Sequence, residues 1–132
     1  MKKILIAEDR PSSRELIRTV LEGCGYAVSE ASDGRQAVEV AKRENPDLLI
    51  VDLQMPALDG LGVLAELRRD ERFADVPIVA LTASAMHGDR ERALEAGFTE
   101  YITKPVNLRF LREEITRLLS DRVANSGVRD ND

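Results

Sequence analysis

Short apolar runs separated by amphipathic stretches cover most of the chain. The runs predict strands buried in a sheet, and they lie at residues 4–7, 26–31, 48–52, 77–82 and 100–103. Between and after them, apolar residues recur every three or four positions, which predicts helices at about residues 11–23, 33–45, 61–70, 86–96 and 107–120. Strands that alternate with helices are typical of an α/β fold.

The spacing of the strands predicts how they are ordered in the sheet. Every connection is long enough to hold a helix, so the sheet should be all parallel. With right-handed crossovers and helices on both faces, we expect a flavodoxin-like, doubly wound (βα)5 domain with strand order 2-1-3-4-5. We assign residues 1–120 to this domain and expect residues 121–132, which are polar and aperiodic, to form a disordered tail.

Local signals mark several helix ends. Ser12 and Glu15 have the spacing of a capping box, and Asn107 is placed to cap the last helix. Cys24 is the single cysteine, so it cannot form an internal disulfide, and we expect a buried, reduced thiol.

Composition excludes some classes of protein. The chain has 132 residues and a net charge of -5, with no basic run, which disfavours direct binding to nucleic acid or to a membrane surface. The apolar run at the N-terminus is soon interrupted by two acids, so it is too short for a signal peptide or a membrane span. We therefore expect a cytoplasmic protein.

Acidic residues follow two strands that should be neighbours. Glu8 and Asp9 come after the first strand, and Asp52 ends the third, so the three carboxylates should meet at the switch point. Their mutual repulsion would be relieved by a hard divalent cation, and Mg²⁺ suits such oxygen ligands. The alternative is that these residues are helix caps and solvated loop acids.

Two further side chains should lie at the same edge of the sheet. Thr82 ends the fourth strand, and Lys104 follows the fifth. Either residue alone could be a satisfied strand end or a surface ion pair. Together with a metal, the hydroxyl and the ammonium group could stabilise a phosphoryl group bonded to Asp52, because aspartate is a known nucleophile toward phosphorus.

The chain resembles the receiver domain of two-component response regulators over about residues 3–120. The matching pieces are Ile4 to Asp9, Val51 to Pro56, Asp59-Gly60, Leu81 to Ala83 and Tyr101 to Pro105. The resemblance implies that Asp52 accepts a phosphoryl group from a phosphohistidine on a histidine kinase or a histidine phosphotransfer protein. It also implies that Asp9, Asp52 and the backbone carbonyl of Gln54 hold Mg²⁺, with Glu8 acting through a water. Lys104 would pair with the phosphoryl group, and the Lys104–Pro105 peptide bond would be cis.

The same resemblance implies a switch. Phosphorylation would draw Thr82 inward and let Tyr101 rotate from solvent toward the core, which would repack the surface formed by residues 86–96, 100–103 and 107–120. That surface would contact a downstream protein target, and a phosphorylation-dependent homodimer is a further partner that the resemblance allows. Gln54 and Ser84 would influence the lifetime of the phosphoryl group. The chain would be a phosphoacceptor rather than an enzyme acting on other substrates.

Other phosphate-handling classes fit the sequence less well. A haloacid-dehalogenase-type phosphatase needs a second aspartate two positions after the nucleophile, where this chain has Gln54. A flavodoxin-like electron carrier needs a hydroxyl- and glycine-rich phosphate loop after the first strand, and the loop here is acidic. A nucleotide hydrolase is excluded because no phosphate-binding P-loop motif is present.

We expect a stand-alone response regulator, and two alternatives stay open. The chain could be a module with the receiver fold that binds a partner without phosphorylation. It could also be the receiver piece of a hybrid kinase or of a larger response regulator.

Overall fold

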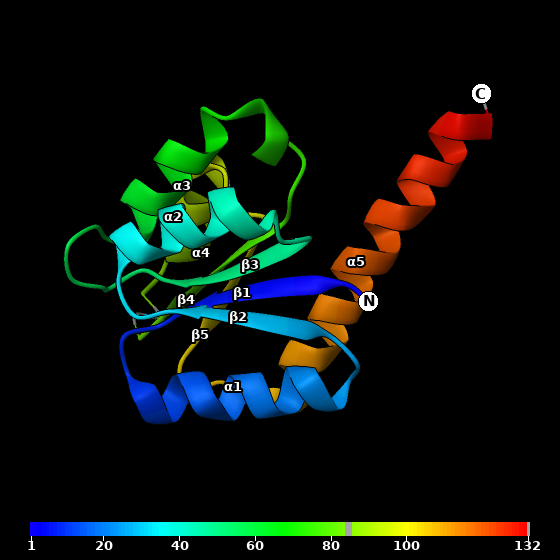
Figure 1. The fold of residues 1–132 in the computed structure, drawn as a ribbon. Helices are drawn as coiled ribbons and strands as arrows, with labels where there is room; N and C mark the ends of the chain where they lie inside the picture. Colours follow the sequence, from blue (N-terminus) through cyan, green and yellow to red (C-terminus); the bar gives the residue numbers. More distant parts are fainter. Residues whose placement is uncertain (84–85, 132) are drawn as a thin grey trace.

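A parallel sheet forms the centre of the molecule (Figure 1). The computed structural model describes residues 1–83 and 86–131, with side chains as far as residue 120. The sheet order is β2-β1-β3-β4-β5, and every neighbouring pair is parallel, so the predicted fold and strand order are confirmed. The strands are β1 (Lys3–Ala7), β2 (Ala27–Ala31), β3 (Leu48–Asp52), β4 (Ile78–Thr82) and β5 (Glu100–Thr103).

Helices cover both faces of the sheet, as Figure 1 shows. α1 (Pro11–Gly23) and α5 (Leu108–Asn131) pack on one face. The opposite face carries α2 (Gly34–Glu44), α3 (Gly60–Arg68) and α4 (Asp89–Ala96), with the short 3₁₀ turn η1 (Glu71–Phe73) after α3.

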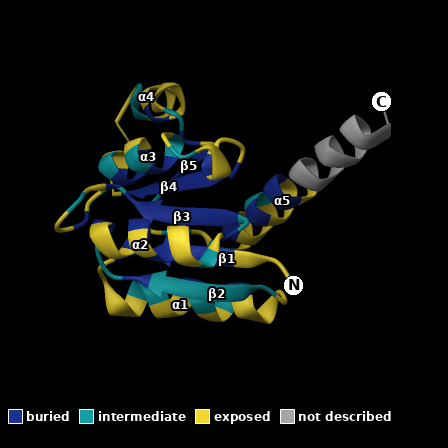
Figure 2. Ribbon diagram, turned by 45° about the horizontal axis from the view of Figure 1, so that its top comes forward, coloured by how far each residue is buried: buried dark blue, intermediate teal, exposed yellow. Residues whose placement is uncertain are grey.

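The central strands are buried on both sides, which is why their sequences are continuously apolar (Figure 2). Successive residues point to opposite faces, so Leu5 and Leu49 enter the core under α2 and α3, whereas Ile6 and Ile50 pack toward α1 and α5. Each such fully buried side chain contributes roughly 1.5–3 kcal/mol to folding. This burial fixes the register of the strands and therefore the positions of the residues that follow them.

Helix ends agree only in part with the sequence patterns. Asn107 caps α5 as predicted, accepting a hydrogen bond of 3.0 Å from the amide of Phe110. The capping box predicted for α1 was wrong: the cap residue is Arg10, no side chain caps the helix, and Pro11 begins it. Cys24 was predicted to be buried but is exposed, because it lies just beyond the last turn of α1.

Two helices differ in length from their predicted ranges. α4 begins at Asp89 rather than near residue 86, and α5 continues to Asn131 rather than ending near residue 120. Ser84 and the side chains of the predicted tail, residues 121–132, lie outside the described residues. The expectation of a disordered tail therefore stays a prediction.

Arg68, at the end of α3, joins three elements through their backbone. Its guanidinium group donates hydrogen bonds to the carbonyls of Phe73 (2.5 Å), Val76 (2.9 Å) and Gly97 (2.9 Å). These carbonyls belong to the last residue of η1, to the connection between η1 and β4, and to the residue that follows α4. The planar guanidinium group thus donates to carbonyls at helix ends and before a strand, which have no partner within a helix or the sheet.

Among the helices formed by described residues, none has the length and apolar character needed to cross a membrane.

Candidate functional site

The five side chains singled out from the sequence gather at the carboxyl edge of the sheet. Asp52 is the last residue of β3, and Thr82 is the last of β4. Glu8 and Asp9 follow β1, and Lys104 follows β5, where its amide donates to the carbonyl of Thr82 at 2.7 Å. The convergence follows from the strand order, because parallel strands end at one edge.

Lys104 lies between two buried carboxylates. Its Nζ is 2.6 Å from Oδ2 of Asp52 and 2.7 Å from Oε1 of Glu8. The side chain of Glu8 is fully buried, and that of Asp52 is 4% exposed. A single ammonium group therefore faces two acids in a region of weak solvent screening, where the interactions are strong.

The balance of charge at this cluster perturbs its acids. Burial and the adjacent Glu8 raise the pKa of Asp52 from 3.8 to about 6. The other oxygen of Asp52, Oδ1, accepts a hydrogen bond of 2.9 Å from the amide of Gln54. Glu8 has the opposite shift: burial opposes its ionisation, but hydrogen bonds with Asp52, Lys104 and Ser13 lower its pKa. The two pKa shifts have opposite directions, so Asp52 is the more basic carboxylate of the pair.

The acids form a set that fits a hard divalent cation. Carboxylate oxygens of Glu8, Asp9 and Asp52 all lie within 4.8 Å of one another, and Asp9 is exposed, so the cluster is open to solvent. Oε2 of Glu8 is buried without a hydrogen-bond partner among the described residues. Mg²⁺ binds oxygen ligands and keeps several of its waters, so it fits a site with three neighbouring carboxylates and one buried oxygen without a partner.

Thr82 and Tyr101 connect this edge to the outer surface. Both are buried, and their side chains are hydrogen-bonded to each other. Burial raises the pKa of Tyr101, and the negative charge of Asp89 adds to this effect. The structure therefore contains the inward orientation of Tyr101 that the resemblance associates with the phosphorylated state.

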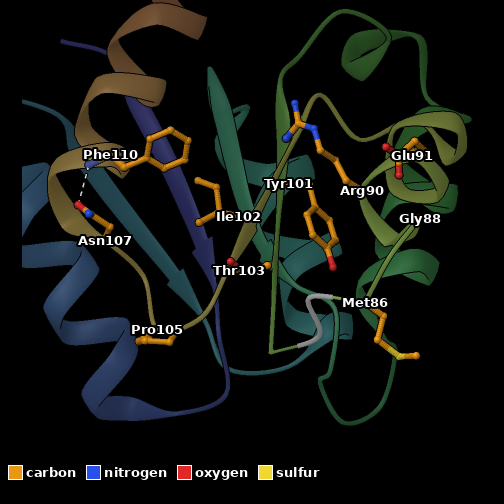
Figure 3. Close-up of a pocket in the computed structure, with 10 residues that line it drawn as sticks. All are labelled: Met86, Gly88, Arg90, Glu91, Tyr101, Ile102, Thr103, Pro105, Asn107 and Phe110. Carbon is orange, nitrogen blue, oxygen red and sulfur yellow. Dashed lines mark hydrogen bonds between the residues drawn. The ribbon is translucent and has the colours of Figure 1, made fainter.

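A hollow of about 440 Å³ lies next to Tyr101, between α4, β5 and the start of α5 (Figure 3). Met86 and Phe110 contribute apolar surface on its two sides, and both are substantially exposed. Arg90 of α4, which also lines the hollow, forms an ion pair with the buried carboxylate of Glu100, and Glu100 pairs in turn with Arg117 of α5. This surface therefore combines a hollow of mixed apolar and polar lining with ion pairs that join α4, β5 and α5.

The sequence patterns missed a glycine that supports the site. Gly34 begins α2, and a Cβ placed there would lie 1.7 Å from the backbone oxygen of Leu58. Its amide also faces the carbonyl of Pro56 at 3.3 Å. The loop after β3, which carries Gln54, thus packs directly on the backbone of Gly34. In the sequence, the Asp-Gly pair at 33–34 indicates only the start of a helix, although a glycine also permits such close approach.

The parallel α/β fold, the acid cluster and the buried threonine and lysine at one sheet edge are the features that the resemblance to a receiver domain implies. The response regulator receiver domain family matches residues 4–116, and the chain belongs to this family. Receiver domains are signalling switches of two-component systems.

Relatives of known name agree with this assignment. The chain is 36% identical over 120 residues to the polar-differentiation response regulator DivK of Brucella ovis, covering 91% of this chain and 98% of DivK. It is 40% identical to the probable transcriptional regulator ycf27 of Porphyridium aerugineum, covering 96% of this chain. The chain spans only 55% of the length of that relative.

Solved structures show the same fold. The receiver domain of the sensor histidine kinase PA1611 from Pseudomonas aeruginosa is 39% identical, with a TM-score of 0.82, covering 90% of this chain and 98% of that one. In that protein a magnesium ion is coordinated in the active-site cleft. The chemotaxis response regulator CheY4 of Vibrio cholerae is 29% identical, with a TM-score of 0.84, covering 89% of this chain and 98% of that one.

Proposed function

We propose that this chain is a phosphorylation-dependent switch whose phosphoacceptor is Asp52. The observation that carries the proposal is the position of Asp52: its carboxylate is buried, lies 2.6 Å from the Lys104 ammonium group, and shares the sheet edge with Glu8 and Asp9. A carboxylate in such surroundings can attack phosphorus while neighbouring groups stabilise the charge that develops.

The transfer requires an ionised Asp52 and a phosphoryl donor. One carboxylate oxygen attacks the phosphorus of a phosphohistidine, the P–N bond breaks, and the leaving imidazole nitrogen keeps the bonding electrons and takes up a proton. The donor is a histidine kinase or a histidine phosphotransfer protein. Because the pKa of Asp52 is about 6, the carboxylate is mostly ionised near neutral pH. Lys104 then pairs with a phosphoryl oxygen.

The proposed metal ligands are the carboxylates of Asp9 and Asp52 and the backbone carbonyl of Gln54, with Glu8 binding through a water. When bound, Mg²⁺ would neutralise charge on the phosphoryl oxygens. Glu8 and Asp9 lie on the β1–α1 loop. The close contact between Gly34 and the backbone of Leu58 supports the loop that carries Gln54.

The signal leaves through the surface formed by α4, β5 and α5. The phosphoryl group on Asp52 would accept a hydrogen bond from Thr82, and this would hold Tyr101 in the inward orientation in which it contacts Thr82. The hollow beside Tyr101 would then contact a downstream protein or a second phosphorylated copy (Figure 3). Because histidine kinases phosphorylate their partners in the cytoplasm, we expect the chain to be cytoplasmic.

The test measures phosphate incorporation from acetyl phosphate, with Mg²⁺ and with EDTA. We expect Mg²⁺-dependent labelling of the native protein, no labelling of Asp52→Asn, and full labelling of Asp59→Asn. Asp59 is the matched control because it follows the same strand but caps α3, accepting from the amide of Gly62 at 2.8 Å. Labelling that persists in Asp52→Asn would refute the assignment of Asp52.

A second arm uses a histidine kinase that phosphorylates itself. Folded native protein that takes up phosphate from neither donor would favour the alternative of a receiver-fold module that binds its partner without phosphorylation.

A further inference from the structure

The two consecutive peptide units before and after Glu8, in the β1–α1 loop, are each held by a hydrogen bond. The amide of Glu8 donates to the carbonyl of Ala31, at the end of β2, at 3.1 Å. The carbonyl of Glu8 accepts a hydrogen bond of 2.8 Å from Nη1 of Arg14. Since the peptide that links Glu8 to Asp9 is planar, fixing this carbonyl also fixes the direction in which the chain enters Asp9.

Arg14 is itself held rigidly. It lies in α1, which runs alongside β2 (Figure 1), and its Nε pairs with Oε1 of Glu30 on that strand at 3.0 Å. Its side chain is only 20% exposed. One planar guanidinium group therefore contacts β2 and the loop at the same time, which a lysine with a single ammonium head cannot reproduce.

Arg18, one turn further along α1, also pairs with Glu30, but among the described residues it forms no hydrogen bond with the β1–α1 loop. Arg18 pairs with Glu30 and also with Glu22, the latter at 3.2 Å, and its side chain is 42% exposed. Arg14 and Arg18 thus have the same charge and the same ion-pair partner, and they differ in the bond to the Glu8 carbonyl.

We infer that Arg14 is a positioning residue for the proposed metal site, acting through the Glu8–Asp9 peptide. The inference rests on the proposed function, because it assumes that these acids bind Mg²⁺. Groups that orient metal ligands typically change affinity by about 10–100-fold when they are removed. Arg14 acts on the backbone of the ligands rather than on their carboxylates, so we expect an effect near the lower end, about tenfold.

Charge and position predict opposite results for this residue. Arg14 is a cation near a cation site, so deleting its charge alone would tighten Mg²⁺ binding by reducing repulsion. If Arg14 instead orients the loop, its removal weakens binding despite that gain. Weaker binding in the variant therefore cannot be attributed to the lost charge.

The experiment measures the Mg²⁺ dissociation constant by calorimetry for the native protein, Arg14→Ala, Arg14→Lys and Arg18→Ala. Amide hydrogen exchange of the segment at residues 7–11 is followed without metal. We expect about tenfold weaker binding and faster exchange in Arg14→Ala, the same direction in Arg14→Lys, and nearly native values in Arg18→Ala. Arg14→Lys keeps the charge and so remains informative if Arg14→Ala does not fold.

Two outcomes separate this inference from the function it rests on. Native protein that binds no Mg²⁺ would overturn the proposed metal site and the inference together. Native protein that binds Mg²⁺, with both Arg14 variants matching Arg18→Ala, would overturn the role of Arg14 and leave the metal site standing.

Discussion

Replacing Asp52 with asparagine should stabilise the metal-free protein while abolishing its proposed chemistry. The acid cluster holds two buried carboxylates against the single ammonium group of Lys104. Asparagine has nearly the same shape, its carbonyl can still accept a hydrogen bond from Lys104, and its amide can donate toward Glu8. Oε2 of Glu8 has no hydrogen-bond partner among the described residues, so a new donor next to this carboxylate should be favourable.

The structure gives the size of the effect. The pKa of Asp52 rises from 3.8 to about 6, and at about 1.4 kcal/mol per pKa unit the ionised form costs the native state about 3 kcal/mol. The neutral amide makes a weaker hydrogen bond to Lys104 than the carboxylate does, which offsets about 1–2 kcal/mol. We therefore expect Asp52→Asn to be about 1–2 kcal/mol more stable than the native protein at pH 8 without Mg²⁺.

The advantage should depend on pH with a definite sign. Because the folded-state pKa of Asp52 exceeds its unfolded value, the native state takes up a proton as pH falls through about 6. The cost of the buried charge then disappears, while Asp52→Asn has no such group. The stability difference should therefore shrink as the pH is lowered from 8 to 5.

Urea unfolding followed by circular dichroism measures this difference, in EDTA and in saturating Mg²⁺. Mg²⁺ stabilises the folded state of a protein only if it binds that state. It should therefore raise the free energy of unfolding more for the native protein than for Asp52→Asn, and the difference in stability between the two should become smaller. Asp59→Asn serves as the control, because its carboxylate caps an exposed helix start, and it should stay within about 0.5 kcal/mol of the native protein. If Asp52→Asn is less stable in EDTA at pH 8, the reasoning about repulsion is wrong.

Two further substitutions test the supports of the site. Arg68→Ala should lower the free energy of unfolding by about 2–4 kcal/mol, because the backbone carbonyls of Val76 and Gly97 lose the donor that Arg68 supplies. Urea unfolding measures this loss of stability, and we expect the Mg²⁺ affinity to stay unchanged because Arg68 does not contact the acid cluster. Gly34→Ala should weaken Mg²⁺ binding and acetyl phosphate labelling, because its Cβ would displace the backbone at Leu58. Gly23→Ala, whose Cβ would meet nothing within 4 Å, should leave both unchanged.

The predictable part of this protein is the part that depends on strand order. Apolar runs predict the strands, and the parallel strand order then predicts that Glu8, Asp52, Thr82 and Lys104 lie at one edge of the sheet. The cis peptide at Lys104–Pro105 is also present, although resemblance rather than local pattern predicted it. Each of these inferences needed only the identity of a residue and the element it follows.

The supporting contacts could not be predicted in this way, because they join a side chain or backbone atom to the backbone of another element. Arg68 reaches a carbonyl 29 positions away, and nothing in its neighbourhood distinguishes it from Arg69. Gly34 matters because Leu58 approaches it, and only the folded loop reveals that approach. The cluster at the sheet edge thus combines acids whose charges repel one another with backbone contacts that hold these acids close together. Repulsion between the acids destabilises the metal-free fold, and the same repulsion favours binding of a divalent cation.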